Sequence, residues 1–214
     1  MIGKTFYLPV KEEVRYFIDR KLINKKYLVE KTYTYTQRPL PIGKDFETYQ
    51  PKGLLAKVLN FRSIEFLVPQ DPNFSIVIPK IGANARIIAN VDAGNEKRYL
   101  ETLKKGVAQA AGTAFPGEGG HIFLFAHSTD YFWNVGSYNA VFYLLNKLEG
   151  GDEVDLFYQG QRVVYKVIDK KIVDPSQVEF LTRKTNREFL TLQTCWPPGT
   201  TLKRLLVFAR RVVE

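Results

Sequence analysis

The stretch EFLTLQTCWPPGTTLKRLLVFAR, residues 188–210, contains the only cysteine of the chain and decides the expected fold. Its first half, FLTLQTC, alternates an apolar face with a more polar face that ends at Cys195, which is the period of a half-buried strand. RLLVFAR predicts a second strand, and the turn WPPGTTLK returns the chain antiparallel to the first. We therefore expect Cys195 and Arg204 to be neighbours, at the end of one strand and the start of the next.

Short strands of this kind recur through the preceding 130 residues. The segments FSIVIPKIG, ARIIANV, HIFLFA, EVDLFY and RVVYKVID each predict a strand, and Gln159 and Gly160 predict a hairpin turn between the last two. EKRYLETLKK and SYNAVFYLLNKL predict two brief helices. Seven or eight short strands with few helices indicate a mostly β fold, a sandwich or a closed barrel, because closure hides the edges of antiparallel sheets.

The first 60 residues have a different sequence pattern. Residues 9–26 predict an amphipathic helix that opens after Pro9, YLVEKTYTYT predicts a strand, and QRPLPIGKDFETYQPKG is irregular. We predict an N-terminal α/β extension over residues 1–60 and a β-barrel domain over residues 61–214. The extension could brace the barrel or cover a groove on it.

Composition limits the classes of partner. The net charge of +9 predicts attraction to anions, but basic residues are dispersed among acidic ones, which disfavours a nucleic-acid module. One cysteine cannot form an internal disulfide, CxxC pairs are absent, and no metal is expected. No apolar run approaches the roughly 20 residues that cross a bilayer, and no signal peptide is visible, so we expect any membrane anchor to lie outside this chain.

The candidate chemistry rests on three residues at strand ends. His121 and His127 are the only histidines; they bracket IFLFA, and His127 stands where the apolar run gives way to polar residues. A cysteine, a histidine and an arginine suffice for acyl transfer: Cys195 as nucleophile with its pKa lowered by a nearby cation, His127 as general acid and base, and Arg204 as donor to the oxyanion. This chemistry needs no metal or organic cofactor.

These segments carry a family resemblance. TLQTC resembles the TLxTC signature of sortases, the cysteine transpeptidases of bacterial cell surfaces, and KRLLVFA, GVAQAAGTAFPGEGGHIFLFAHS and FSIVIPKIGANARI are similar to further family segments in the same order. The resemblance implies a closed eight-stranded β-barrel with Cys195 as nucleophile, His127 as acid/base and Arg204 as oxyanion donor. It also implies that Thr194 helps to bind the acyl group.

The resemblance further implies the partners and the location. Sortases cleave an LPxTG-like sorting signal after its threonine and pass the acyl group to an amine of a peptidoglycan precursor or a pilin lysine. This implies an enzyme at the extracellular face of the cell membrane. The loop before the cysteine strand, VDPSQVEFLTRKTNRE, lacks the acidic run that would bind calcium. Its Val178, Phe180 and Leu181 could line a pocket for the sorting signal or fold back on the barrel.

Two other functions fit the same residues. A cysteine peptidase would release the acyl group to water through the same three side chains, because only the access of amine and water differs. A non-catalytic β-barrel binding module would carry an inert thiol, with Cys195 far from His127.

Overall fold

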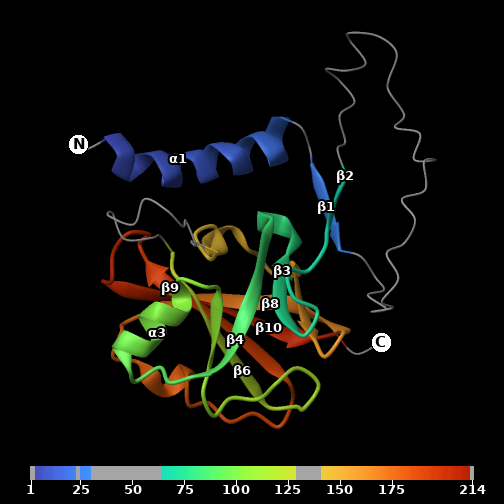
Figure 1. Cartoon of the computed structure of the whole chain (residues 1–214), viewed down its shortest axis with the longest axis vertical. Coiled ribbons are helices and arrows are strands. Elements are labelled where there is room, and N and C mark those ends of the chain that lie inside the picture. Colours follow the sequence, from blue (N-terminus) through green and yellow to red (C-terminus); the bar gives the residue numbers. More distant parts are fainter. Residues whose placement is uncertain (1–2, 23–24, 30–63, 129–140, 213–214) are drawn as a thin grey trace, which may run out of the picture.

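A computed structural model describes residues 3–22, 25–29, 64–128 and 141–212. The centre of the fold is a barrel whose eight strands close in the order β10-β8-β7-β3-β4-β5-β6-β9 (Figure 1). The barrel strands are β3 (Phe74–Ile78), β4 (Ala83–Val91), β5 (Val107–Ala110), β6 (His121–Phe125), β7 (Glu153–Tyr158), β8 (Gln161–Val173), β9 (Phe189–Trp196) and β10 (Lys203–Arg211). The predicted closed eight-stranded barrel is confirmed.

The interior of the barrel is filled by the apolar face of each strand. Large aliphatic side chains from strands on all sides are fully buried there, including Ile76, Ile78, Ile122, Leu124, Leu156, Leu190 and Leu192. Because alternate residues of a strand point to opposite faces, the same strands present a second set of side chains outward. On the outside of β4 and β5, Leu103 and Tyr99 of helix α3 (Glu96–Leu103) pack over Phe125 and its neighbours.

The strand pairings show which strands run in the same direction through the barrel. β3 is antiparallel to β4, β4 is parallel to β5, β5 is antiparallel to β6, and β6 is parallel to β9. β3, β6 and β9 therefore end at the same end of the barrel, which we call the Cys195 end. The opposite end, where β6 begins, is the His121 end.

The predicted hairpin is confirmed, and one predicted helix is wrong in its described part. Gln159 and Gly160 both have positive φ, 51° and 78°, as a two-residue turn that follows the strand twist requires. The segment 137–148 was expected to be a helix. Its residues 141–148 form turns and only one 3-10 helix, η3 (Leu145–Lys147), and residues 137–140 lie outside the described part.

The physical reason is that this segment caps the barrel rather than lying beside it. The Phe142 amide donates to the His127 carbonyl at 3.4 Å, and Phe142, Leu144, Leu145 and Leu148 are all buried in the main core. Strand β5 was not predicted, because VAQA is short and its alanines carry little β signal.

The N-terminal region forms helix α1 (Gly3–Phe17), continued by one π-helical stretch, η1 (Ile18–Leu22), and strand β1 (Lys26–Val29). The predicted helix exists, but its predicted bounds are wrong, because α1 begins at Gly3 and contains Pro9 in its interior and the helical stretch ends at Leu22. β1 pairs in parallel with β2 (Ile64–Leu67), and Val29 and Leu67 pack on Val77 and Phe157 outside the barrel. No helix among the described residues is long and apolar enough to cross a membrane. The rest of the predicted strand 27–36 and the predicted boundary at residue 60 fall outside the described residues, so that boundary stays a prediction.

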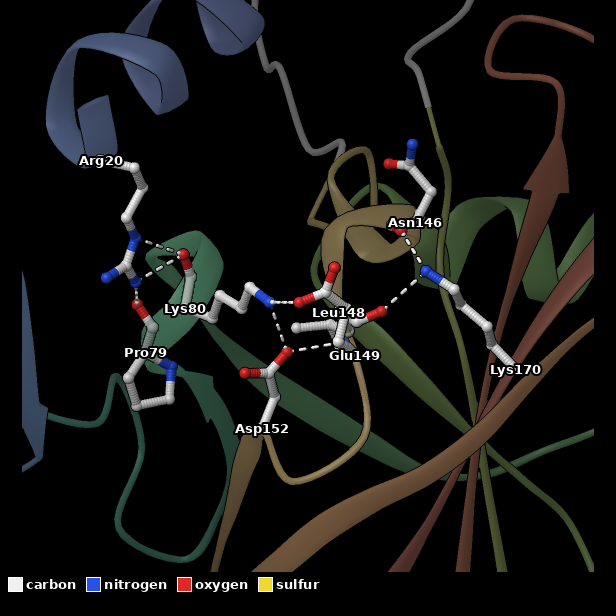
Figure 2. Close-up of polar contacts among 8 residues, drawn as sticks. All are labelled: Arg20, Pro79, Lys80, Asn146, Leu148, Glu149, Asp152 and Lys170. Atoms are coloured by element: carbon white, nitrogen blue, oxygen red, sulfur yellow. Dashed lines mark hydrogen bonds and ion pairs between the residues drawn. The ribbon is translucent and has the colours of Figure 1, made fainter.

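Polar contacts fasten this region to the Cys195 end of the barrel (Figure 2). The Arg20 guanidinium donates to the carbonyls of Pro79 and Lys80, at 2.9 and 2.6 Å, in the 3-10 helix η2 (Pro79–Ile81) that follows β3. The Lys80 ammonium in turn lies 2.9 Å from Glu149 and 2.8 Å from Asp152, just before β7. The described part of the extension therefore braces the barrel.

Candidate active site

Cys195 and Arg204 are directly opposite each other on neighbouring strands. The antiparallel register of β9 and β10 pairs Arg204 with Cys195 and Leu205 with Thr194. Both residues are half-buried at the rim of the barrel, one residue before the end of β9 and one after the start of β10. The strand pair that the sequence predicted thus brings the thiol and the guanidinium together.

His127 lies just beyond the end of β6, which pairs in parallel with β9 on its other side. The register runs to Phe125 opposite Gln193, and the Ala126 amide donates to the Gln193 carbonyl at 3.1 Å. Continuing this register by two residues sets His127 beside Cys195. The chain positions of the thiol, the imidazole and the guanidinium therefore converge at one end of three adjacent strands.

Thr194 ties the histidine strand to the cysteine strand. Its side chain is buried, and its hydroxyl donates to the Ala126 carbonyl at 2.9 Å. Ala126 and Thr194 each come immediately before a candidate catalytic residue. The bond therefore joins the two strands next to His127 and Cys195. The sequence did not reveal this contact, because the direction of a threonine hydroxyl cannot be read from a strand pattern.

Burial and charge act in opposite directions on the thiol. Desolvation raises the pKa of Cys195, and the Arg204 charge partly offsets that rise. The sequence led us to expect a lowered pKa from the cation alone. The net direction is upward because the thiol is partly buried.

Arg204 is itself held by the turn that leads into β10. Its Nη1 donates to the carbonyls of Thr201 and Lys203, at 3.1 and 3.2 Å. Within the part of the chain that the structure describes, the hydrogen bonds of this guanidinium are made by Nη1. Nη2 and Nε have no hydrogen-bond partner among those residues, and a guanidinium N–H is a donor that suits an anionic oxygen.

His121 lies at the far end of β6 and takes no part in this cluster. It is buried, its Nε2 lies 2.8 Å from the Thr191 hydroxyl, and burial lowers its pKa to about 4. The described residues also contain no group of three or more acidic, histidine or cysteine side chains that could hold a metal ion.

The profile of the sortase domain matches residues 76–212, which include every strand of the barrel except the first two residues of β3. The chain belongs to the sortase family. Sortase D of Bacillus subtilis (strain 168) is 30% identical over 138 residues, 63% of this chain and 61% of that protein. This chain thus aligns with less than two thirds of its curated relative.

Solved sortases share the fold. Sortase C-1 from Actinomyces oris has a TM-score of 0.56 and 32% identity, covering 68% of this chain and 76% of that one. The lid mutant of sortase A from Corynebacterium diphtheriae has a TM-score of 0.54 and 28% identity, covering 67% of this chain and 72% of that one. Sortases are cell-surface-associated transpeptidases that act on sorting signals and amine acceptors.

Of the three loop residues predicted to line a pocket for a sorting signal, two pack on the barrel and one is exposed to solvent. Phe180, in the 3-10 helix η4 (Val178–Phe180), packs against Phe208 outside the barrel, and Leu181 packs with the Phe125 cluster under α3. These two side chains fold back on the barrel, the second arrangement that the sequence left open. Val178 is 60% exposed and is the residue of the three that solvent reaches most easily.

Proposed function

We propose that this chain is a cysteine transpeptidase that cleaves an LPxTG-like sorting signal after its threonine and transfers the acyl group to an amine. The observation that carries the proposal is the pairing of Arg204 with Cys195, beside a strand whose register leads to His127. Membership of the sortase family supports the same reaction.

In the first half of the reaction, the Cys195 sulfur attacks the threonine carbonyl while His127 accepts the thiol proton. The carbonyl oxygen becomes an oxyanion, to which the Arg204 guanidinium donates; one such donor contributes roughly 3 kcal/mol. The C–N bond then breaks, His127 returns the proton to the departing amine, and the acyl group remains on sulfur as a thioester.

In the second half, an amine of a peptidoglycan precursor or of a pilin lysine attacks the thioester. His127 accepts a proton from that amine, the new amide forms, and the thiol leaves with its proton restored. We place the reaction at the extracellular face of the cell membrane. Val178 is our candidate for contact with the apolar residues of the signal, with Thr194 shaping the acyl site through Ala126, while Phe180 and Leu181 support the loop from beneath.

The test is incubation with a small library of LPxTG-like peptides and a set of amines, followed by mass spectrometry. We expect an acyl-enzyme on Cys195 and amide products with at least one amine, and neither species with Cys195→Ala. Intact Cys195 with no thioester for any peptide would contradict the proposal.

The same assay separates the two competing functions. A cysteine peptidase would form the acyl-enzyme but release only the free acid at every amine concentration. A binding module would retain peptides equally well in the wild type and in Cys195→Ala, with no covalent species in either.

A further inference from the structure

Helix α1 and the following stretch η1 contact the barrel through Glu13, Tyr16 and Arg20. Glu13 forms an ion pair with Lys147 of η3 at 3.0 Å, and Tyr16 packs on the main core beneath the Lys147 ammonium. Arg20 completes the attachment through the Pro79 and Lys80 carbonyls (Figure 2). These contacts fix which side of the helix faces away from the protein.

The side that faces away is apolar. Val10, Val14 and Phe17 are 55%, 48% and 55% exposed, and their spacing of four and three residues aligns them along one face of the helix. Ile18 continues the stripe into η1. An amphipathic helix on a globular protein ordinarily packs such a stripe on the core, but none of the residues that the structure describes covers this one.

The charges on this side are positive. Lys11 and Lys21 are exposed next to the apolar side chains. The acidic residues of the segment are engaged elsewhere: Glu12 with Arg15 at 2.5 Å, Glu13 with Lys147, and Asp19 with the Tyr27 hydroxyl at 2.7 Å. The outward face of α1, defined as Val10, Lys11, Val14, Phe17, Ile18 and Lys21, therefore combines apolar and cationic side chains without a carboxylate.

We propose that the outward face of α1 docks on an anionic lipid bilayer. Apolar side chains enter the boundary between headgroups and acyl chains while lysines meet the lipid phosphates, which is how interfacial helices bind. A second copy of the chain fits this face less well. Antiparallel pairing of two copies would set Lys11 of one helix near Lys21 of the other, with no acidic side chain on the face to neutralise them.

Docking through this face would orient the molecule. α1 lies across the barrel in Figure 1 and is attached to η2 and η3, and η2 directly follows the end of β3 at the Cys195 end. The bilayer would thus lie on the side of the barrel where β6 and β9 end. This inference does not depend on the proposed reaction.

The test is sedimentation of the whole chain with phosphatidylcholine vesicles, with and without phosphatidylglycerol. We expect binding to the anionic vesicles that weakens as salt is added. The double variant Val14→Gln, Phe17→Gln should lower the partition coefficient at least about tenfold, because two apolar side chains no longer enter the bilayer. Lys11→Gln, Lys21→Gln should lower it on anionic vesicles as well.

A matched control is Val68→Gln, Ile168→Gln, which changes two apolar residues of similar exposure, 45% and 44%, that belong neither to α1 nor to η1. It should bind as the wild type does, with circular dichroism melts showing that every variant is folded. The proposal would be overturned if the Val14→Gln, Phe17→Gln variant bound vesicles as tightly as the wild type does. It would also be overturned if only the lysine variant lost binding, because that result would indicate a simple polyanion site. A lipid-free dimer that the Val14→Gln, Phe17→Gln variant abolishes would assign the face to a second copy instead.

Discussion

Replacing Thr194 by valine tests whether the bond between β9 and the end of β6 positions the candidate active site. Valine keeps the size and the β-branch of threonine but removes the hydroxyl that donates to the Ala126 carbonyl at 2.9 Å. The carbonyl then loses a buried partner, which costs about 1–3 kcal/mol. In a protein of this size, that loss corresponds to a fall in melting temperature of roughly 2–4 °C per kcal/mol.

The effect on the reaction should exceed the effect on stability. Because Ala126 and Thr194 each precede a reacting residue, a small relaxation of this contact shifts His127 relative to Cys195, and a misplacement of about 1 Å can cost about 100-fold in rate. We expect kcat/KM for peptide transfer to fall at least about tenfold in Thr194→Val, measured by mass spectrometry of the amide product, at a temperature where the variant is fully folded.

The matched control is Thr191→Val, in the same strand. Thr191 is also buried, and its hydroxyl also forms a short hydrogen bond, 2.8 Å from His121, but this bond lies toward the opposite end of the barrel. Thr191→Val should be destabilised to a similar degree and keep its kcat/KM. Equal rates in the two variants, whether both are reduced or both are unchanged, would refute the positioning argument.

Three further changes test the electrostatics of the fold. Arg204→Met should raise the pKa of Cys195 further, because the lowering influence of the guanidinium charge is removed. The pH profile of iodoacetamide alkylation should shift upward, and an unshifted profile would contradict this. The pKa of His121 falls to about 4, so the folded state resists its protonation, and the contribution of His121 to stability should drop by roughly 2–3 kcal/mol between pH 7 and pH 4.5. The stability difference between the wild type and His121→Gln, from urea titrations at the two pH values, should change by that amount. Arg162→Met removes the ion-pair partner of buried Asp155, whose pKa is raised to about 6. Denaturant unfolding should show that the free energy of unfolding falls by about 3 kcal/mol at pH 8. The fall should be smaller at pH 5, because Asp155 accepts a proton there.

The barrel and the Cys195–Arg204 pair could be predicted because they depend on short-range patterns. Alternation in FLTLQTC fixed the buried face of β9, and the prolines and glycine after Trp196 marked the point where the chain turns back. Because Arg204 follows Cys195 by only nine residues, an antiparallel second strand must place the two residues close together. The hairpin at Gln159 and Gly160 was predictable for the same reason, since two central residues with positive φ define its turn.

Features that depend on tertiary contacts could not be predicted. A helical stripe at Val10, Val14 and Phe17 looks the same in sequence whether it packs on the core or faces away, and only the contacts of Arg20 and Tyr16 decide the orientation. The segment 137–148 has helical spacing in the sequence, but its described residues 141–148 form turns and one 3-10 helix that pack on the main core. The direction of the pKa shift at Cys195 likewise depends on burial, which the sequence does not give.

The two ends of the barrel differ in a way that supports our proposal of the chemistry at the Cys195 end. At the His121 end, the Glu188 carboxylate accepts from the Tyr165 hydroxyl, the Gly117 amide at 3.2 Å and Arg211 at 3.1 Å, so its oxygens are satisfied inside the protein. These bonds join β8, β10 and the loop before β6 to the residue that precedes β9. At the Cys195 end, the thiol and the guanidinium are half-buried, and neither carries a carboxylate partner among the described residues. A bound carbonyl there would meet polar groups that no internal partner already neutralises, which is the condition that stabilisation of a developing charge requires.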